Sequence, residues 1–470
     1  MQIRTQRHTR SGRPRLAVVL VTSVGVAACA SPSWDRAWPE ARPLGRGLES
    51  VRAPTSPEAV VRHHSTPANP QGELRLRDAL AMALERNPDL EAFSWAVRAR
   101  EARTLQAGLR PNPEVSLEVE NFAGSGPTRS FDASETTLAL AQLIETAGKR
   151  RARQRIAESE QRLAGWDYEA ARVDVFSRVT RAFVAVLATQ EQLDLAGELL
   201  DVAREALRTV ETRLREGAAS PVERARAAVA LSAARVEREQ RQADLDKART
   251  ELASFWGGPK PVFEAVAGDL FDAPTPPPLS SLARSLERSP ALARWREELA
   301  QRESLITLAD AERIPDVTLG AGIRHLAQGS DDALIAVLRI PIPVFDQNQG
   351  ERLATRFDLS RARSLERSAR TRLRTALDTA HRELLAAHAR VEALRDETLP
   401  AAEHAYQQTL RAYRRGLFRY LDVLDAQRTL FDIRANFITA LQAYHTAVAA
   451  IEGLTGEPVQ PTGDPVSSRS

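Results

Sequence analysis

The sequence predicts a mainly α-helical fold with β-hairpins, built as two copies of one helix–β-hairpin–helix unit. Three observations carry this prediction. Residues 147–215 contain no proline and keep a helical mixture of Ala, Leu, Val, Arg and Glu. Residues 113–122 instead alternate apolar and polar side chains, which is the pattern of a β-strand. Short landmark sequences from the first half then recur about 200 residues later.

The composition is that of a folded protein with charged helix surfaces. The chain has 470 residues, of which 43% are hydrophobic, 27% charged and 5% aromatic, and Ala, Leu, Arg and Glu are abundant. The formal net charge is +3, but residues 1–28 hold five Arg and no acidic residue, so the remainder carries +3 − 5 = −2. A nearly neutral mature chain gives no indication of nucleic-acid binding.

The N-terminus has the features of a secretory signal peptide, assigned to residues 1–28. An Arg-rich start precedes the apolar run 16–28, which is too short to span a membrane as a helix. The run ends Val-Ala-Ala before Cys29, the only cysteine, and so resembles a bacterial lipobox. The resemblance implies lipidation of Cys29; the alternative is an ordinary signal peptide with an incidental cysteine. Residues 29–73 are rich in Pro, Ser and Arg and are predicted to form an extended, lipidated tether.

The first structural repeat is assigned to residues 74–265. Asn87-Pro88 interrupts a helical pattern, with Asn as cap and Pro in the first helical position. The next helix ends near Arg110, and strands are predicted over 113–122 and 135–144. On the first strand Val115, Leu117 and Val119 share one face, and Glu114, Ser116, Glu118 and Glu120 share the other. Alone, this alternation fits an edge hairpin of a soluble helical protein equally well.

A very long helix follows, over 147–215, and at roughly 1.5 Å per residue it would measure about 100 Å. A turn over 215–221 ends it, where Gly217 suits the left-handed position and Ser220-Pro221 suits the start of a return helix. The two helices would form an antiparallel, coiled hairpin. A Pro-rich linker over 266–278 then separates this unit from the second repeat.

The second repeat, residues 279–456, preserves the register of the first. Leu84-Glu-Arg-Asn-Pro88 corresponds to Leu286-Glu-Arg-Ser-Pro290, with 286 − 84 = 202. Pro113-Glu-Val-Ser-Leu117 corresponds to Pro315-Asp-Val-Thr-Leu319, with 315 − 113 = 202, and Gly217 to Gly416, with 416 − 217 = 199. Such constant offsets indicate an internal duplication. The second copy is therefore assigned strands 315–325 and 333–342, a kink at Pro400, a hairpin turn over 413–420 and, after it, a flexible tail over 457–470.

Four strands in a bilayer would impose further requirements. Every strand edge in lipid must be paired, and membrane barrels need about eight strands or more. Several copies of the chain would therefore have to share one barrel. The acidic faces would need water inside that barrel if Val115, Leu117 and Val119 faced lipid.

The repeated layout over about 74–456 resembles the TolC-like outer-membrane factors of Gram-negative bacteria. The similar motifs are Asn87-Pro88, Arg110-Pro-Asn-Pro113, Gly148-Lys-Arg150, and Tyr413-x-x-Gly416 with Leu421-Asp-Val-Leu-Asp-Ala-Gln427. The resemblance implies a homotrimer whose 12-stranded barrel lies in the outer membrane and continues as an α-helical tunnel through the periplasm. It also implies docking to a periplasmic membrane-fusion adaptor and an inner-membrane RND pump.

Three segments are similar to the CzcC-type branch of that family: Arg110–Glu118, Gln142–Arg150 and Pro341–Gly350. The resemblance implies a passive duct for heavy-metal cations, selected by the pump. The sequence itself offers no metal site, because its one Cys, two Met and eight His are scattered. His381 and His388 lie seven residues apart, and a solvated helix face is the preferred interpretation of that spacing.

The same resemblance supplies candidate site residues. Tyr413, Asp422 and Asp425 would form a periplasmic gate, in which three copies of the two acids constrict the tunnel and attract cations. Two solvated helix acids are the alternative, since a spacing of three also places both on one face. The adaptor-contact tips would be Gly217, Ser220, Pro221, Gly416 and Leu417, and Glu114, Glu118 and Glu120 would line the barrel lumen. This sequence departs from the family at Phe418, where the family has an Arg.

Other functions remain as alternatives. An outer-membrane duct for drug efflux or type I secretion would share this architecture. A periplasmic coiled-coil adaptor lipoprotein would share the helical hairpins and the lipid anchor, but not two β-hairpins about 200 residues apart. A spectrin-like rod would lack both the export signal and the strands. No nucleotide loop, nucleophile motif or zinc spacing occurs in the sequence, so neither an enzyme nor a cofactor is predicted.

Overall fold

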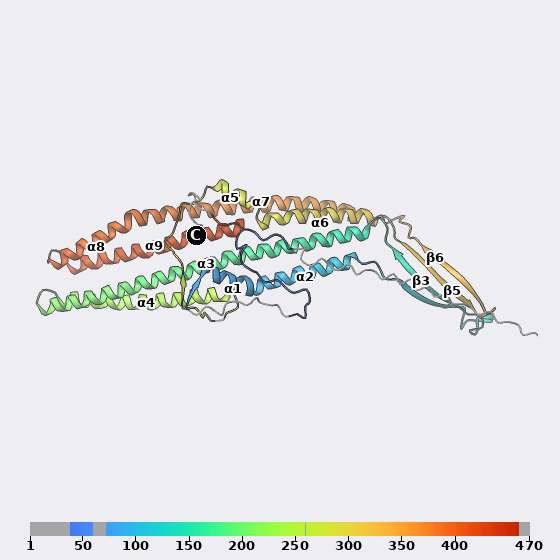
Figure 1. The fold of residues 1–470 in the computed structure, drawn as a ribbon, viewed down its shortest axis with the longest axis horizontal. Helices are drawn as coiled ribbons and strands as arrows, with labels where there is room; N and C mark the ends of the chain where they lie inside the picture. The colour runs from blue at the N-terminus through green and yellow to red at the C-terminus, as the bar shows by residue number, and fades with distance from the viewer. Residues whose placement is uncertain (1–37, 60–71, 259, 460–470) are drawn as a thin grey trace, which may run out of the picture. The chain divides into compact units, whose positions relative to one another are not determined.

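Long helices and one four-stranded sheet dominate the part of the chain that the computed structural model describes, residues 38–59, 72–258 and 260–459 (Figure 1). The first repeat supplies α1 (Leu76–Arg86), α2 (Pro88–Gly108), α3 (Lys149–Arg215) and α4 (Pro221–Ser254); the second supplies α5 (Leu279–Leu286), α6 (Pro290–Glu312), α7 (Gln349–Ala393), α8 (Leu399–Arg414) and α9 (Tyr420–Thr455). Within these described residues, no helix is both long and apolar enough to cross a membrane.

The ends of the helices follow from local sequence. In α2, Asn87 Oδ1 accepts a hydrogen bond from the Leu90 amide at 3.1 Å, which confirms the predicted cap. Helix α3 runs for 67 residues between Gly148 and Gly217, both of which have φ = +75°, a conformation that glycine adopts without strain. Ser220 Oγ then accepts from the Glu223 amide at 3.2 Å and starts α4.

The predicted kink at Pro400 takes the form of a π-turn, Leu394–Thr398, between α7 and α8. Proline has no amide proton, and its ring clashes with the carbonyl four residues earlier. The chain responds by widening one turn, so the Leu399 amide donates to the Leu394 carbonyl, five residues back. The helix therefore continues past Pro400 instead of ending there.

The main hydrophobic core lies where the short and long helices meet. Helix α3 contacts α1, α2, α4, α6 and α9, and α7 contacts α6 and α9. Fully buried side chains include Leu84, Leu90, Val186, Leu252 and Leu441, and they come from both repeats. A second cluster joins α5 and α6 to α7 and α9 through Leu286, Leu292, Leu384 and Ile451.

The sheet contains β2 (Glu114–Glu120), β3 (Glu135–Ile144), β5 (Val317–Leu326) and β6 (Asp331–Arg339) in the order β2-β3-β5-β6, with every neighbouring pair antiparallel. A 3₁₀ turn, η1 (Gly126–Thr128), lies in the loop between β2 and β3. Strands β2 and β6 are the two edges. Three successive antiparallel pairings separate β2 from β6, so these two edge strands run in opposite directions.

The two faces of the sheet differ in chemistry. Leu117 pairs with Leu138, Leu138 with Ile323, and Ile323 with Leu334, so these apolar side chains form one row across all four strands. They are 69, 55, 55 and 89% exposed, respectively. On the opposite face small residues lie at the centre: a Cβ added to Gly322 would be 2.5 Å from the Leu138 carbonyl oxygen. Only glycine fits this close approach.

Several predicted strand limits need correction. The first strand covers Glu114–Glu120 rather than 113–122, because Pro113 has no amide to pair and Asn121 adopts φ = +58°. The third and fourth cover Val317–Leu326 and Asp331–Arg339 rather than 315–325 and 333–342. Pairing on β6 ends before Pro341 and Pro343, which have no amide proton. The second strand was predicted at its observed limits.

The predicted tether is not extended throughout, because residues 38–59 pack onto the helices. Leu44, Val51 and Ala53 are buried. The buried pair Glu169 and Arg172 on α3 holds this segment. Glu169 Oε1 accepts from the Arg42 amide at 2.6 Å, and Arg172 Nη2 donates to the Leu44 carbonyl at 3.0 Å. Cys29 and the predicted signal peptide lie outside the described residues.

The linker is also held along its length, which the sequence did not indicate. It begins with β4 (Ala265–Ala267), which pairs in parallel with β1 (Glu73–Arg75). His445 Nε2, Tyr444 Oη and His381 Nε2 then contact the carbonyls of Leu270, Pro274 and Pro277 at 2.9, 2.6 and 3.0 Å. His381 is 7% exposed, so its interpretation as part of a solvated face was wrong.

The beginning of the predicted flexible tail is likewise fixed. Glu457 forms an ion pair with Arg288 at 2.9 Å, and the Val459 amide donates to Glu452 Oε1 at 3.1 Å. Residues 460–470 lie outside the described part. Three short segments are therefore fixed on the helices near α1 and α5 within the described part of the chain. They are residues 38–59, the linker and residues 457–459, and the first two connect the two repeats.

Candidate functional site at the hairpin turns and the sheet

The two hairpin turns, residues 216–220 and 415–419, have the same backbone design. Gly217 and Gly416 adopt φ = +75° and +78°. The Ala218 amide donates to the Arg213 carbonyl at 2.7 Å, and the Leu417 amide donates to the Ala412 carbonyl at 3.0 Å. Both turns thus end a long helix with a glycine-based cap that satisfies its last carbonyls.

Arg213, near the end of α3, connects the two hairpins. Its guanidinium carbon lies 4.6 Å from the centroid of the Tyr413 ring. Its Nη1 donates to the Tyr413 carbonyl at 3.2 Å, and its Nη2 donates to the Ala218 carbonyl at 3.4 Å. A cation over an aromatic face, combined with hydrogen bonds to carbonyls, holds α3 against α8 at this end of the molecule.

A small buried cluster surrounds this contact. It consists of Val210, Ala227, Tyr413, Tyr420 and Val423, which come from α3, α4, α8 and α9. The rings of Tyr413 and Tyr420 are 5.8 Å apart. All four helices of the two hairpins therefore meet in one apolar contact beneath the turns.

Some polar atoms of this cluster and of the adjacent Arg213 are buried without a hydrogen-bond partner. The hydroxyls of Tyr413 and Tyr420 and the Nε of Arg213 are buried without a hydrogen bond. Burial raises the pKa of Tyr413 and raises that of Tyr420 to about 12. Each unsatisfied buried group costs roughly 1–3 kcal/mol, a cost that water would remove if the hairpins separated. The contact is therefore weaker than its buried area alone would suggest.

The predicted gate acids occupy different environments. Asp422 Oδ2 accepts a hydrogen bond from the Arg419 amide at 2.9 Å and so helps to start α9. Asp425 lies one turn further along α9 and is exposed. Of the three predicted gate residues, only Tyr413 belongs to the buried cluster between the hairpins.

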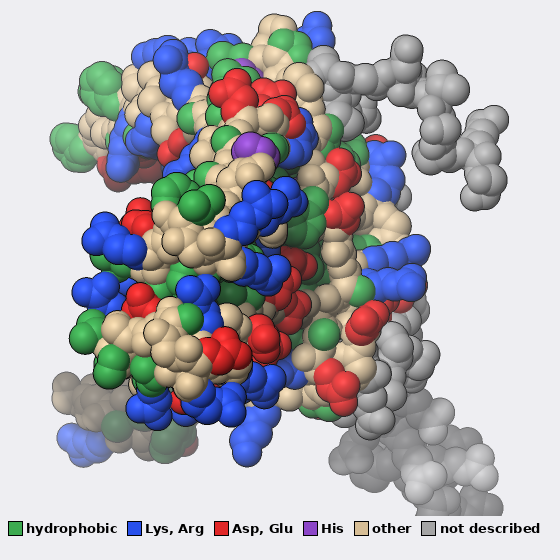
Figure 2. Space-filling view, turned by 90° about the vertical axis from the view of Figure 1, so that its left-hand side faces the viewer, with side chains coloured by type: hydrophobic (Ala, Val, Ile, Leu, Met, Phe, Trp, Pro, Cys, Tyr) green, Lys and Arg blue, Asp and Glu red, His purple; other side chains and the backbone are tan. Residues whose placement is uncertain are grey.

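The surface around the turns carries mixed charge with exposed apolar side chains (Figure 2). Arg215, Arg414, Arg415 and Arg419 are exposed there, alongside Glu216. The predicted tip residues Gly217, Ser220, Pro221 and Gly416 are exposed, and Leu417 is 74% exposed. Phe418, which replaces the family's Arg, is 51% exposed. The tips thus present side chains that a partner protein could cover.

The predicted lumen acids lie together on the face of the sheet opposite the apolar row. Glu114 and Glu118 are exposed. Glu120 differs, because Arg324 reaches it from β5 at 3.5 Å and also binds Glu135 at 2.8 Å. Arg324 therefore offsets the charge of Glu120 at the loop end of the sheet, which the sequence pattern of β2 did not reveal.

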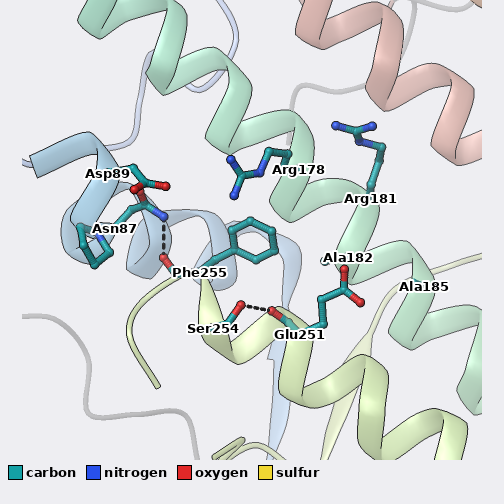
Figure 3. Close-up of a pocket in the computed structure, with 10 residues that line it drawn as sticks. Asn87, Asp89, Arg178, Arg181, Ala182, Ala185, Glu251, Ser254 and Phe255 are labelled. Carbon is teal, nitrogen blue, oxygen red and sulfur yellow. Dashed lines mark hydrogen bonds between the residues drawn. The ribbon is translucent and has the colours of Figure 1, made fainter. Parts of the chain in front are cut away.

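A cavity of about 660 Å³ lies where α2, α3 and α4 meet, and Asn87 and Pro88 are among the residues that line it (Figure 3). Asn87 Nδ2 donates to the Phe255 carbonyl at 2.9 Å, which ties the start of α2 to the end of α4. Arg178 lies over the Phe255 ring, and Asp89, Arg181 and Glu251 line the same cavity. Among the described residues, no three His, Cys, Asp or Glu side chains are placed to hold a metal ion.

The Gly148-Lys-Arg150 motif joins the two repeats beneath the sheet. Lys149 is 7% exposed, and its Nζ lies 2.8 Å from Asp316 Oδ1, just before β5. Thr146 adds hydrogen bonds from its amide to Asp316 and from its hydroxyl to the Pro315 carbonyl, at 2.9 and 2.7 Å. From sequence this motif was recognised only by its resemblance to the family, because its structural role depends on Asp316, 167 residues away.

Comparison with known proteins connects these features to one family. The model for "Outer membrane efflux protein" matches residues 79–258 and 282–457. The cobalt-zinc-cadmium resistance protein CzcC of Cupriavidus metallidurans is 31% identical over 83% of this chain and 92% of its own length. The nickel-cobalt-cadmium resistance protein NccC of Alcaligenes xylosoxydans xylosoxydans is 26% identical over 72% of this chain and 70% of its own.

Solved structures share the fold at low sequence identity. A crystal structure of CusC matches with a TM-score of 0.70 at 19% identity, covering 84% of this chain and 96% of that one. The outer-membrane channel OprN matches with a TM-score of 0.66 at 18% identity, covering 88% of this chain and 100% of that one. The arrangement of long helices and β-hairpins is thus the fold of these channels.

Proposed function

The chain belongs to the outer membrane efflux protein family, whose members are channels and not enzymes, and we propose that it is the outer-membrane duct of a tripartite export system for heavy-metal cations. It would assemble as a homotrimer with a 12-stranded barrel. Its helices would form a periplasmic tunnel that meets a membrane-fusion adaptor and an inner-membrane RND pump.

The observation that carries the channel proposal is the sheet. Within the described residues of one chain its β2 and β6 edges are unpaired, and they run in opposite directions, so β6 of one copy can pair antiparallel with β2 of the next. Repetition of this contact closes a ring without changing the fold. The family resemblance supplies the number of copies, three.

The two faces of the sheet support an apolar exterior and an aqueous interior. The exposed row of Leu117, Leu138, Ile323 and Leu334 would face lipid. Glu114 and Glu118, on the opposite face, would line the lumen, with Glu120 partly neutralised by Arg324. A polar lumen inside an apolar band is the usual construction of membrane barrels.

The hairpin turns would form the closed, pump-facing end of the tunnel. Arg213, Tyr413 and Tyr420 would hold the hairpins of one chain together, and Asp422 and Asp425 would place acids near the axis. The exposed tips, including Leu417, would contact the adaptor. The unsatisfied hydroxyls in the buried cluster support a contact that separates at small cost.

Heavy-metal cations are proposed as cargo because of the named relatives. The protein called cobalt-zinc-cadmium resistance protein matches at 31% identity, and one called nickel-cobalt-cadmium resistance protein at 26%. A second candidate cargo is an organic molecule: the pyoverdine export protein OpmQ of Pseudomonas aeruginosa matches at 26% and the toluene efflux protein TtgF of Pseudomonas putida at 23%. Family membership favours the duct over the adaptor lipoprotein.

The cargo can be tested by deleting the gene in its own host. Loss of the chain is expected to lower tolerance of cobalt, zinc or cadmium, and re-expression of the chain should restore it. Unchanged metal tolerance, with lost tolerance of toluene or lost pyoverdine export, would favour the second cargo. A chain recovered from the inner-membrane fraction instead of the outer membrane would contradict the duct itself.

A further inference from the structure

Apolar side chains continue beyond the end of the paired sheet in the second repeat. Strand β6 stops at Arg339, and the next six residues are Ile-Pro-Ile-Pro-Val-Phe. Ile340, Ile342, Val344 and Phe345 are 48, 81, 64 and 91% exposed. Such a continuous exposed apolar segment is unusual on a water-facing surface and indicates contact with something apolar.

The segment extends the apolar face of the sheet. Leu338 pairs with Leu319 on that face, and alternate residues of an extended chain share one face, so Ile340 and Ile342 continue it. Pro341 and Pro343 restrict the backbone and donate no hydrogen bond, so strand pairing stops while the chain stays extended. The apolar exterior thereby gains about four residues, or roughly 13 Å.

A sharp change to polar sequence follows. Phe345 is succeeded by Asp346-Gln-Asn-Gln-Gly350, and the Val344 amide donates to the Ile342 carbonyl at 2.9 Å where the chain turns toward α7. Asn348 Nδ2 then donates to the Ala309 carbonyl at 3.0 Å. The boundary between exposed apolar and hydrogen-bonded polar residues therefore falls immediately after Phe345.

The corresponding junction of the first repeat, between β3 and α3, is polar. Its side chains bind other residues of the same chain. After Ile144, Glu145 forms an ion pair with Arg153 at 2.5 Å, and Thr146 and Lys149 bind Pro315 and Asp316. The fold thus does not require an apolar segment at this level. The exposed apolar residues after β6 need a separate explanation.

We propose that residues 340–345 insert into the inner leaflet of the outer membrane, with Ile340 and Ile342 against acyl chains and Phe345 at the headgroup boundary. The proposal rests on the proposed barrel and adds an anchoring site to it. Girdles of aromatic side chains mark that boundary in membrane barrels. A neighbouring copy would approach along the β6 edge, in the plane of the sheet, whereas Ile340 and Ile342 belong to its apolar face.

Spin labels on single cysteines in the assembled, full-length protein in phospholipid vesicles would test this. Labels replacing Ile342 and Phe345 are expected to collide with dissolved oxygen more than with a water-soluble nickel complex, as a label replacing Leu334 should. A label replacing the exposed Asp201 on α3 gives the aqueous reference. The wild-type chain, with Cys29 alone, gives the background.

Labels at 342 and 345 that behave like the Asp201 label would overturn the proposal, and so would labels shielded from both reagents, because these would mark a contact with another chain. If the Leu334 label itself behaved as aqueous, the barrel would fail instead of the anchor alone. As a second measurement, Phe345→Asp should lower the amount of assembled protein severalfold, and Gln347→Asp should not. Equal amounts for these two variants would also contradict the anchor.

Discussion

The guanidinium of Arg213 lies over the ring of Tyr413 and donates to the carbonyl of the same residue. Arg213 is near the end of α3 and Tyr413 near the end of α8, so one side chain joins the hairpins of both repeats. The family resemblance had indicated Asp422, Asp425 and Tyr413 as gate residues, without a partner for Tyr413. The structure identifies Arg213 as its partner, which no sequence motif had singled out.

Arg213→Ala should favour the open tunnel. The cation–aromatic contact and the hydrogen bonds together contribute about 2 kcal/mol, enough to shift the closed-to-open ratio about thirtyfold. Single-channel recordings in planar bilayers should show a higher conductance or longer openings. Arg224→Ala is the matched control, because Arg224 pairs with Glu211 within the first hairpin. Indistinguishable recordings for the two variants would remove Arg213 from the gate.

Asp425→Asn should reduce cation preference at the narrow end of the tunnel. Removal of one acid from each of three chains weakens the local negative field, so the ratio of cation to anion permeability should fall a fewfold in reversal-potential measurements. Asp201→Asn removes an exposed acid from α3 as a control. An unchanged ratio for Asp425→Asn would favour the alternative of a solvated helix acid.

Asp422 should show an additional effect on stability, because its carboxylate also caps α9. Asp422→Asn keeps an oxygen for the Arg419 amide, whereas Asp422→Ala does not. Asp422→Ala should therefore unfold at lower temperature than Asp422→Asn, by an amount that corresponds to about 1 kcal/mol. Equal unfolding temperatures would show that the cap contributes nothing.

The ion pair between Lys149 and Asp316 should stabilise the junction of the two repeats. Lys149 is buried, so removal of its partner leaves a charge without compensation, at a cost of about 3 kcal/mol. Asp316→Ala should therefore lower the unfolding temperature markedly, and Asp316→Ala with Lys149→Met should recover part of the loss. The exposed pair Arg204–Asp201 on α3 is the control. Additive losses in the double variant would contradict the pairing.

Stability should depend on pH through Glu452. Burial raises its pKa from the ordinary 4.5 to about 7, although the Val459 amide opposes the shift. Between pH 4.5 and about 7, the folded chain keeps a proton on Glu452 that the unfolded chain has released. The stabilisation from this proton is therefore complete below about pH 4.5 and is lost as pH rises through about 7. The loss amounts to at most about 3 kcal/mol. Comparison with Glu452→Gln by thermal unfolding at pH 5 and pH 8 isolates it, and equal pH slopes would exclude Glu452.

The features predicted correctly from sequence are those set by local patterns. Alternation identified β2, the absence of proline identified α3, and Asn87-Pro88 identified the start of α2. The strand after Leu326 was placed too far toward the C-terminus, because pairing on β6 ends at Arg339, before Pro341 and Pro343, which have no amide proton.

Contacts between distant segments were not predictable in this way. The docking of residues 38–59 depends on Glu169 and Arg172, and the fixed course of the linker depends on His381, Tyr444 and His445. These residues lie on helices whose patterns indicate only which face is apolar. A buried polar side chain has no periodic signature, so Arg213 and Lys149 could be assigned partners only once the helices were placed side by side.

The shared barrel is tested most directly by Leu117→Arg compared with Glu118→Arg. The two positions are adjacent on β2 but lie on opposite faces, and an arginine in the middle of the lipid-facing surface costs about 2–4 kcal/mol, whereas the lumen tolerates charge. The measurement is the amount of SDS-resistant trimer in the outer-membrane fraction. We expect Leu117→Arg to lose most of the trimer and Glu118→Arg to keep it. Normal trimer levels for Leu117→Arg would contradict the barrel.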